Sequence, residues 1–139
     1  MKYSSICSGA TTTQFGTGTE INGTITVNAG ASLSVAGDRA IYFGSLTNVD
    51  NSGTIAATPA TNINATAIYA ATGAVTLNNA TGASVTGAAS GAGAAYGVYA
   101  GDTATVTNSG AISATGEGEG EAAGVYALNG DVTVTNAGT

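Results

Sequence analysis

The sequence predicts an all-β fold: a right-handed parallel β-helix, or solenoid, with about 28 residues per coil and three short strands in each coil. Three observations favour this fold. Marker residues recur at a nearly constant period, apolar and polar residues alternate between the markers, and large core side chains are scarce. Short strands of this kind cannot bury an apolar face alone, but stacking one repeat on the next buries it.

The period rests on two independent markers. Tyrosines recur after 27, 30 and 27 residues, and asparagines recur after 28, 29 and 28 residues. The tyrosines are Tyr42, Tyr69, Tyr99 and Tyr126, and the asparagines are Asn51, Asn79, Asn108 and Asn136. Because both markers keep one period, we assign residues 24–139 to four or five coils of the β-helix. Residues 1–23 are assigned to an N-terminal segment or cap, in which Cys7 is expected as a free thiol on a flexible chain.

Alternation within each repeat predicts the strands and their inward faces. In the third repeat Ala104, Val106, Asn108 and Ile112 share one parity, with β-branched residues prominent among them. Period-two alternation of this kind indicates strands with one buried face. Stacked coils should then align equivalent residues in columns about 4.8 Å apart. We expect one column of Val27, Val49, Leu77, Val106 and Val134, and another of Leu33, Ile55, Val85 and Ile112.

The same parity turns the marker asparagines inward and the marker tyrosines outward. A buried amide needs hydrogen-bond partners, which its neighbours one coil away can supply. We therefore expect a structural ladder of Asn51, Asn79, Asn108 and Asn136. The tyrosines should form a mostly exposed stripe that could bind sugars or proteins. Its members are Tyr42, Tyr69, Tyr99 and Tyr126. A cross-strand ladder that only stabilises the sheet is the alternative interpretation.

Charge and residue chemistry argue against several functions. The chain contains two basic residues (Lys and Arg) and eight acidic residues (Asp and Glu). The resulting net charge of −6 disfavours nucleic-acid binding. The chain has no histidine to act as a base, and Cys7 has no histidine partner.

Asp102 and Asp131 follow glycines at equivalent corners, where Asp supports turns. Residues 116–121 read GEGEGE, which could form a weak calcium site or a loop held open by charge repulsion. We expect no catalytic residues, no cofactor and no metal, and hence no enzyme.

Two segments carry a resemblance to a known family. GVYALNGDVTVTNAGT and NSGTIAATPA resemble repeats of bacterial autotransporter passenger domains, the type V secreted surface proteins. The resemblance implies display at the surface of a Gram-negative bacterium, with a structural and adhesive role. Partners would be a host glycan or protein, or other copies of the chain. Membrane attachment would come only through a C-terminal β-barrel outside these residues.

Other interpretations stay open at this point. Heads of trimeric autotransporters also use small-residue β-rolls, with a period near half of this one. A scaffold for a polysaccharide-active enzyme, or a self-associating fibre module, would fit the same repeats. The fourth repeat stops at Thr139, one residue before the position that Ile55 and Ile112 hold in other repeats. We therefore expect a longer protein in which the repeats continue.

Overall fold

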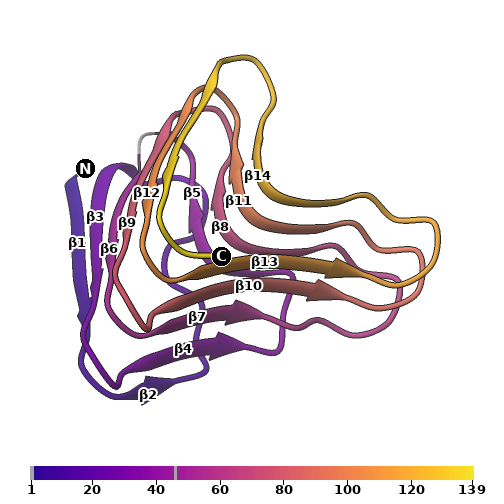
Figure 1. The fold of residues 1–139 in the computed structure, drawn as a ribbon, viewed down its shortest axis with the longest axis horizontal. Coiled ribbons are helices and arrows are strands. Elements are labelled where there is room, and N and C mark those ends of the chain that lie inside the picture. The colour runs from indigo at the N-terminus through magenta and orange to yellow at the C-terminus, as the bar shows by residue number, and fades with distance from the viewer. Residues whose placement is uncertain (1, 46) are drawn as a thin grey trace.

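The computed structural model describes residues 2–45 and 47–139, and these form fifteen strands and no helix. All strand pairing among them is parallel, and the strands stack into a β-solenoid with three sheets (Figure 1). The predicted fold class is thereby confirmed. With no helix in the described part, no helical segment there could span a membrane.

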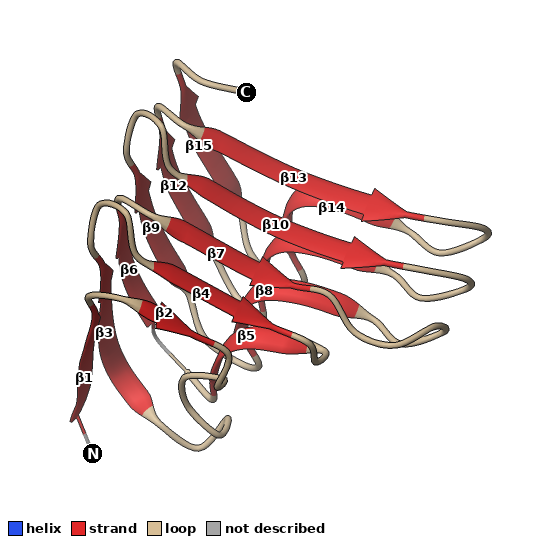
Figure 2. Ribbon diagram, turned by 90° about the horizontal axis from the view of Figure 1, so that it is seen from below, coloured by secondary structure: helices blue, strands red, loops and turns tan. Residues whose placement is uncertain are grey.

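Each sheet takes one strand from every coil that reaches it. The first sheet contains β1 (Lys2–Cys7), β3 (Ile21–Val27), β6 (Thr47–Asn51), β9 (Val75–Asn79), β12 (Ala104–Asn108) and β15 (Val132–Asn136). The second contains β2 (Ala10–Thr11), β4 (Ser32–Val35), β7 (Thr54–Ala57), β10 (Ser84–Ala89) and β13 (Ala111–Gly116). The third contains β5 (Arg39–Phe43), β8 (Ala65–Ala70), β11 (Ala95–Ala100) and β14 (Ala122–Ala127). Figure 2 shows the coils rising in order from the N-terminal to the C-terminal end.

The coils have an L-shaped cross-section. Figure 1 shows β10 and β13 running along one leg of the L and β12 along the other, while the third sheet bends around the inner angle. Along the first of these legs the second and third sheets lie very close together. A Cβ atom on Gly87 would come within 2.2 Å of the Tyr96 carbonyl oxygen. In this leg Ala65, Ala89 and Ala95 form a small core that is separate from the main one.

Strand register confirms one predicted column and corrects the other. Leu33, Ile55 and Val85 pair in sequence and are fully buried, and Ile112 continues the column. In the first sheet, however, it is Ile25 that pairs with Val49. Val27 pairs with Asn51 instead, so the predicted column was wrong by two residues at its first member. A shift of two residues preserves the inward parity, which is why alternation alone did not reveal it.

The stack extends into the N-terminal residues. β1 pairs with β3 and β2 pairs with β4, so both add a layer below the first recognisable repeat. Cys7 pairs with Val27 and is only 4% exposed. Its thiol is free and donates to the Gly9 carbonyl oxygen at 3.3 Å. The expectation of a thiol on a flexible segment was therefore wrong, because Cys7 fills an inward position of the first sheet.

Candidate functional site

The marker asparagines lie at the corner between the first and second sheets. Asn51 Nδ2 donates to Asn79 Oδ1 at 2.8 Å, and Asn79 Nδ2 donates to Asn108 Oδ1 at 2.7 Å. Asn108 Nδ2 donates to Asn136 Oδ1 at 2.7 Å. The first three residues are buried, and Asn136 is exposed on the last coil. The asparagines thus form a directional chain of hydrogen bonds along the solenoid, which we call the asparagine ladder.

Each buried amide also joins the backbone of the next coil. The Nδ2 atom of Asn51 donates to the Ser84 carbonyl oxygen at 3.0 Å, and that of Asn79 donates to the Ala111 carbonyl oxygen at 3.1 Å. The Oδ1 atom of Asn51 accepts from the Gly53 amide at 3.1 Å, within its own corner. One side chain therefore fixes both the tight corner and its spacing from the next coil, which assigns these residues to the scaffold.

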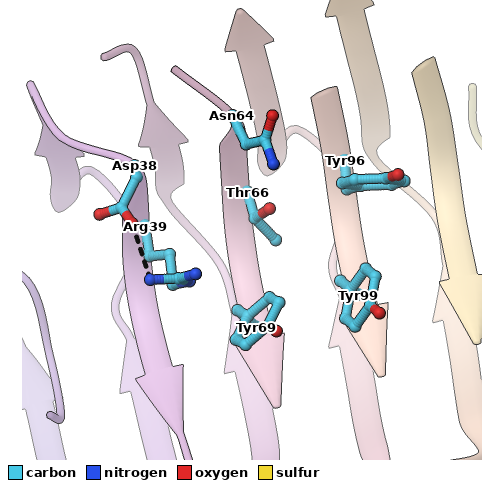
Figure 3. A pocket seen from close by; sticks show the side chains of 7 residues that line it. All are labelled: Asp38, Arg39, Asn64, Thr66, Tyr69, Tyr96 and Tyr99. Atoms are coloured by element: carbon cyan, nitrogen blue, oxygen red, sulfur yellow. Dashed lines mark hydrogen bonds and ion pairs between the residues drawn. The ribbon is translucent and has the colours of Figure 1, made fainter. Parts of the chain in front are cut away.

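The outer face of the third sheet holds the candidate binding site, because a kink changes its alternation. Gly97 and Val98 are adjacent and both buried, as are Ala67 and Ile68 one coil below. Tyr96 therefore turns to the same outer face as Tyr99, three residues further on (Figure 3). The first residue of each pair is small, and at Gly97 a Cβ atom would lie 2.6 Å from the Gly124 carbonyl oxygen.

Aromatic rings contact one another along this face. The ring centroids of Tyr69 and Tyr99 are 4.8 Å apart and nearly parallel, and those of Tyr99 and Tyr126 are 5.2 Å apart and nearly parallel. Tyr42 meets Tyr69 edge-to-face at 5.4 Å, and Tyr96 meets Tyr99 edge-to-face at 5.3 Å. We call these five residues the tyrosine surface. Their contacts are of the kind that stabilises aromatic pairs.

The tyrosines are less exposed than the sequence suggested. Ile41, Ile68 and Val98 are buried on the inner side, so the rings do lie outside. All five tyrosines are nevertheless half-buried, and the expectation of a mostly exposed stripe was wrong. Stacked rings cover each other's faces, and what they leave to solvent is mainly their edges and hydroxyl groups. A ligand would therefore meet a ridge of ring edges, with its recognition chemistry supplied beside the ridge.

Arg39 supplies a cation at the N-terminal end of the tyrosine surface. Its guanidinium carbon lies 4.5 Å from the Tyr42 ring centroid and 4.4 Å from that of Tyr69. The same guanidinium donates to the Asp38 carboxylate at 2.7 Å. The aromatic contacts hold a flexible side chain in place, and Asp38 compensates its charge.

A pocket of about 240 Å³ opens between Arg39 and Tyr96. Thr66 lies between them, because Arg39 pairs with Thr66 and Thr66 with Tyr96 across adjacent strands. Figure 3 shows Asn64 above this position and the rings of Tyr69 and Tyr99 below it. Tyr96 precedes the kink and Tyr99 follows it, and both line the pocket. The pocket therefore lies in the inner angle of the L.

The Tyr96 hydroxyl differs from those of the other tyrosines in its contact with a carboxylate. Its hydroxyl donates to the Glu121 carboxylate at 3.0 Å. Partial burial, followed by this hydrogen bond and the negative charge of Glu121, raises the pKa of Tyr96 to about 12. Partial burial first, and then neighbouring tyrosines and Glu121, also raise the pKa of Tyr99. Both hydroxyls stay protonated at neutral pH, and that of Tyr96 is already donated to Glu121.

The acidic candidates do not gather into a site. Glu121 contacts Tyr96, while Glu117 and Glu119 are exposed. Asp102 and Asp131 are exposed at their corners. Among residues 2–45 and 47–139, no three His, Cys, Asp or Glu side chains are placed to hold a metal ion.

Sequence reasoning found the tyrosine column but missed the pocket beside it. The pocket residues do not repeat from coil to coil as the marker tyrosines do; they include Arg39, Asn64, Thr66 and Tyr96. Strict alternation would also place Tyr96 on the inner face of the sheet, away from Tyr99. Glycine at position 97, next to the inward Val98, was the one signal of a kink. Comparison of the chain with protein-family models, curated proteins and solved structures gave no match.

Proposed function

We propose that this chain is part of an autotransporter-type passenger, displayed on a bacterial surface, and that the tyrosine surface makes its adhesive contacts. The solenoid fold and the repeat segments quoted above support the passenger assignment. The observation that carries the adhesive role is the position of the rings. Five tyrosines and Arg39 lie together on one outer face, where the core does not require aromatic residues.

Aromatic residues and arginine are the side chains that contribute most to binding at protein interfaces. Tyrosine offers apolar area and a hydroxyl with few rotatable bonds, so its ordering on binding costs little. The ridge of rings is already held by mutual contacts, which lowers that cost further. A host glycan or an extracellular protein would meet a preformed surface.

The test compares adhesion of the wild-type chain with that of a Tyr69→Ser/Tyr99→Ser variant. Each protein is coupled to inert beads and applied to panels of immobilised host glycans and extracellular-matrix proteins. The matched control is Thr105→Ser/Thr133→Ser, which changes two exposed outward positions on neighbouring strands of the first sheet. We expect the tyrosine variant to lose adhesion and the threonine variant to keep it, with both folded at the assay temperature. Equal adhesion of all three proteins would contradict the proposal.

A further inference from the structure

The pocket beside the tyrosine surface exists because the side chains at one set of equivalent positions differ in length from coil to coil. Arg39, Thr66 and Tyr96 occupy equivalent positions on β5, β8 and β11. Thr66 is much shorter than either neighbour and is only 3% exposed, so it forms the floor of a hollow between two larger side chains. Its volume of about 240 Å³ is below the range of roughly 300–1,000 Å³ typical of pockets for drug-sized ligands. The hollow matches a single sugar ring better than an extended ligand.

The pocket offers both hydrogen-bond donors and acceptors. Asn64 Oδ1 accepts from the Ala94 backbone amide at 2.9 Å, and its Nδ2 is directed toward the pocket (Figure 3). Arg39 uses one nitrogen on Asp38, and a guanidinium carries five N–H donors in all. Asp38 contributes carboxylate acceptors, because an ionised carboxylate only accepts.

The charge of the pocket favours a neutral ligand. Arg39 is the only cation lining it and Asp38 the only anion, and the two are paired at 2.7 Å. A ligand carboxylate would have to compete with Asp38 for the guanidinium, while Asp38 repels it. A neutral sugar has hydroxyl groups that donate to Asp38 and accept from Arg39 and Asn64 at once. Its C–H groups can lie against the carbons of the tyrosine rings.

We propose that this pocket binds one neutral pyranose unit of a glycan. Asp38, Arg39 and Asn64 would form hydrogen bonds with the hydroxyl groups of the sugar. The proposal rests on the adhesive function above and narrows its ligand to neutral sugars. Thr66 sets the space for the ring, and the Tyr69–Tyr99 stack forms the apolar wall. Asp38 sets the preference for neutral over acidic sugars.

The test follows binding by NMR on the ¹⁵N-labelled chain. The probes are methyl glycosides of glucose, galactose, mannose and N-acetylglucosamine, with methyl glucuronide and N-acetylneuraminic acid as the acidic arm. The Asn64 side-chain amide and the Arg39 Nε–H signals report on the pocket. Thr66→Tyr fills the hollow from its floor, and the equivalent position on the next coil already carries Tyr96. Thr105→Tyr adds the same ring at an exposed position of the first sheet and is the control for the substitution itself.

We expect at least one neutral glycoside to shift the Asn64 and Arg39 signals saturably. Thr66→Tyr should abolish these shifts and Thr105→Tyr should leave them. Asp38→Asn removes the repelling charge and should improve binding of the acidic probes by about tenfold, as expected for a hydrogen bond to a charged group. A preference of the wild type for acidic probes would overturn the inference, as would binding that survives Thr66→Tyr.

Failure of the inference can be told apart from failure of the adhesive function. If no glycoside shifts the pocket signals but the bead assay shows tyrosine-dependent adhesion, the pyranose site is refuted and the adhesive surface stands. If the glycosides do not bind and adhesion is also independent of the tyrosines, both are refuted.

Discussion

Asn108 offers the sharpest test of how the coils are held together. It is 3% exposed, and its side chain accepts from Asn79 Nδ2 at 2.7 Å. Its two N–H groups donate to Asn136 Oδ1 at 2.7 Å and to the carbonyl oxygens of Thr139 at 3.1 Å and Gly110 at 3.2 Å. Replacement by leucine, which has a similar size, removes one acceptor and two N–H donors, and it leaves one N–H of Asn79 without its acceptor.

The magnitude follows from the partners that remain. Asn79 Nδ2 keeps the Ala111 carbonyl oxygen, and the Thr139 carbonyl oxygen keeps the Ile112 amide. The hydrogen bonding of three groups, one acceptor and two N–H donors, at about 1 kcal/mol each outweighs the roughly 2 kcal/mol that a buried leucine contributes. The orphaned N–H adds up to about 2 kcal/mol. We therefore expect Asn108→Leu to lower the free energy of unfolding by about 1–3 kcal/mol.

The assay is urea denaturation followed by circular dichroism, with hydrogen exchange of the β12 amides as a local probe. Asn78→Leu is the control, because Asn78 is exposed and its amide donates to Asp50 at 2.9 Å on the outer face. That control should cost less than about 0.5 kcal/mol. If Asn108→Leu proves as stable as the wild type, or Asn78→Leu costs as much, the ladder does not stabilise the stack.

Two further predictions concern the third sheet. Gly97→Ala should destabilise the fold by about 1–3 kcal/mol, because the new Cβ would lie 2.6 Å from the Gly124 carbonyl oxygen and 2.7 Å from Ile112 Cγ2. Gly124→Ala meets nothing closer than 3.9 Å and should be nearly neutral in the same thermal melts. Tyr96 should deprotonate near pH 12, as followed by tyrosinate absorbance, and Glu121→Gln should lower that pKa. Because the folded pKa lies above the ordinary value of 10.0, the stability contributed by Tyr96 is complete below pH 10 and is lost as the pH rises to about 12. A melting temperature that increased between pH 10 and 12 would contradict this sign.

Alternation and period were enough to predict the solenoid and much of its interior. Val85 is fully buried although its repeat carries two extra residues at the corner, because an even insertion keeps the parity. The same property hid the error at Val27, which pairs with Asn51 rather than filling the column of Val49. Lys2–Cys7 forms a strand whose one tyrosine, Tyr3, lies outside the marker spacing, so the repeat could not reveal it.

The candidate site was less predictable because it depends on departures from the repeat. Tyr96 reaches the outer face only through the kink at Gly97, which strict alternation does not contain. The pocket depends on Thr66 being short where Arg39 and Tyr96 are long. Half-burial of the tyrosines follows from contact between rings on different coils, which parity does not describe.

The central claim is that the outer tyrosine surface binds ligand while the inner asparagine ladder holds the coils. The most direct measurement is the dissociation constant for the strongest-binding member of the glycan and matrix panels. It is determined for the wild type, Tyr99→Ser and Asn108→Leu at a temperature where all three are folded. We predict that Tyr99→Ser weakens binding severalfold, as expected when aromatic contacts worth roughly 1 kcal/mol are lost, and that Asn108→Leu leaves binding unchanged despite its lower stability. Unchanged binding by Tyr99→Ser, or losses that follow stability in both variants, would contradict the claim.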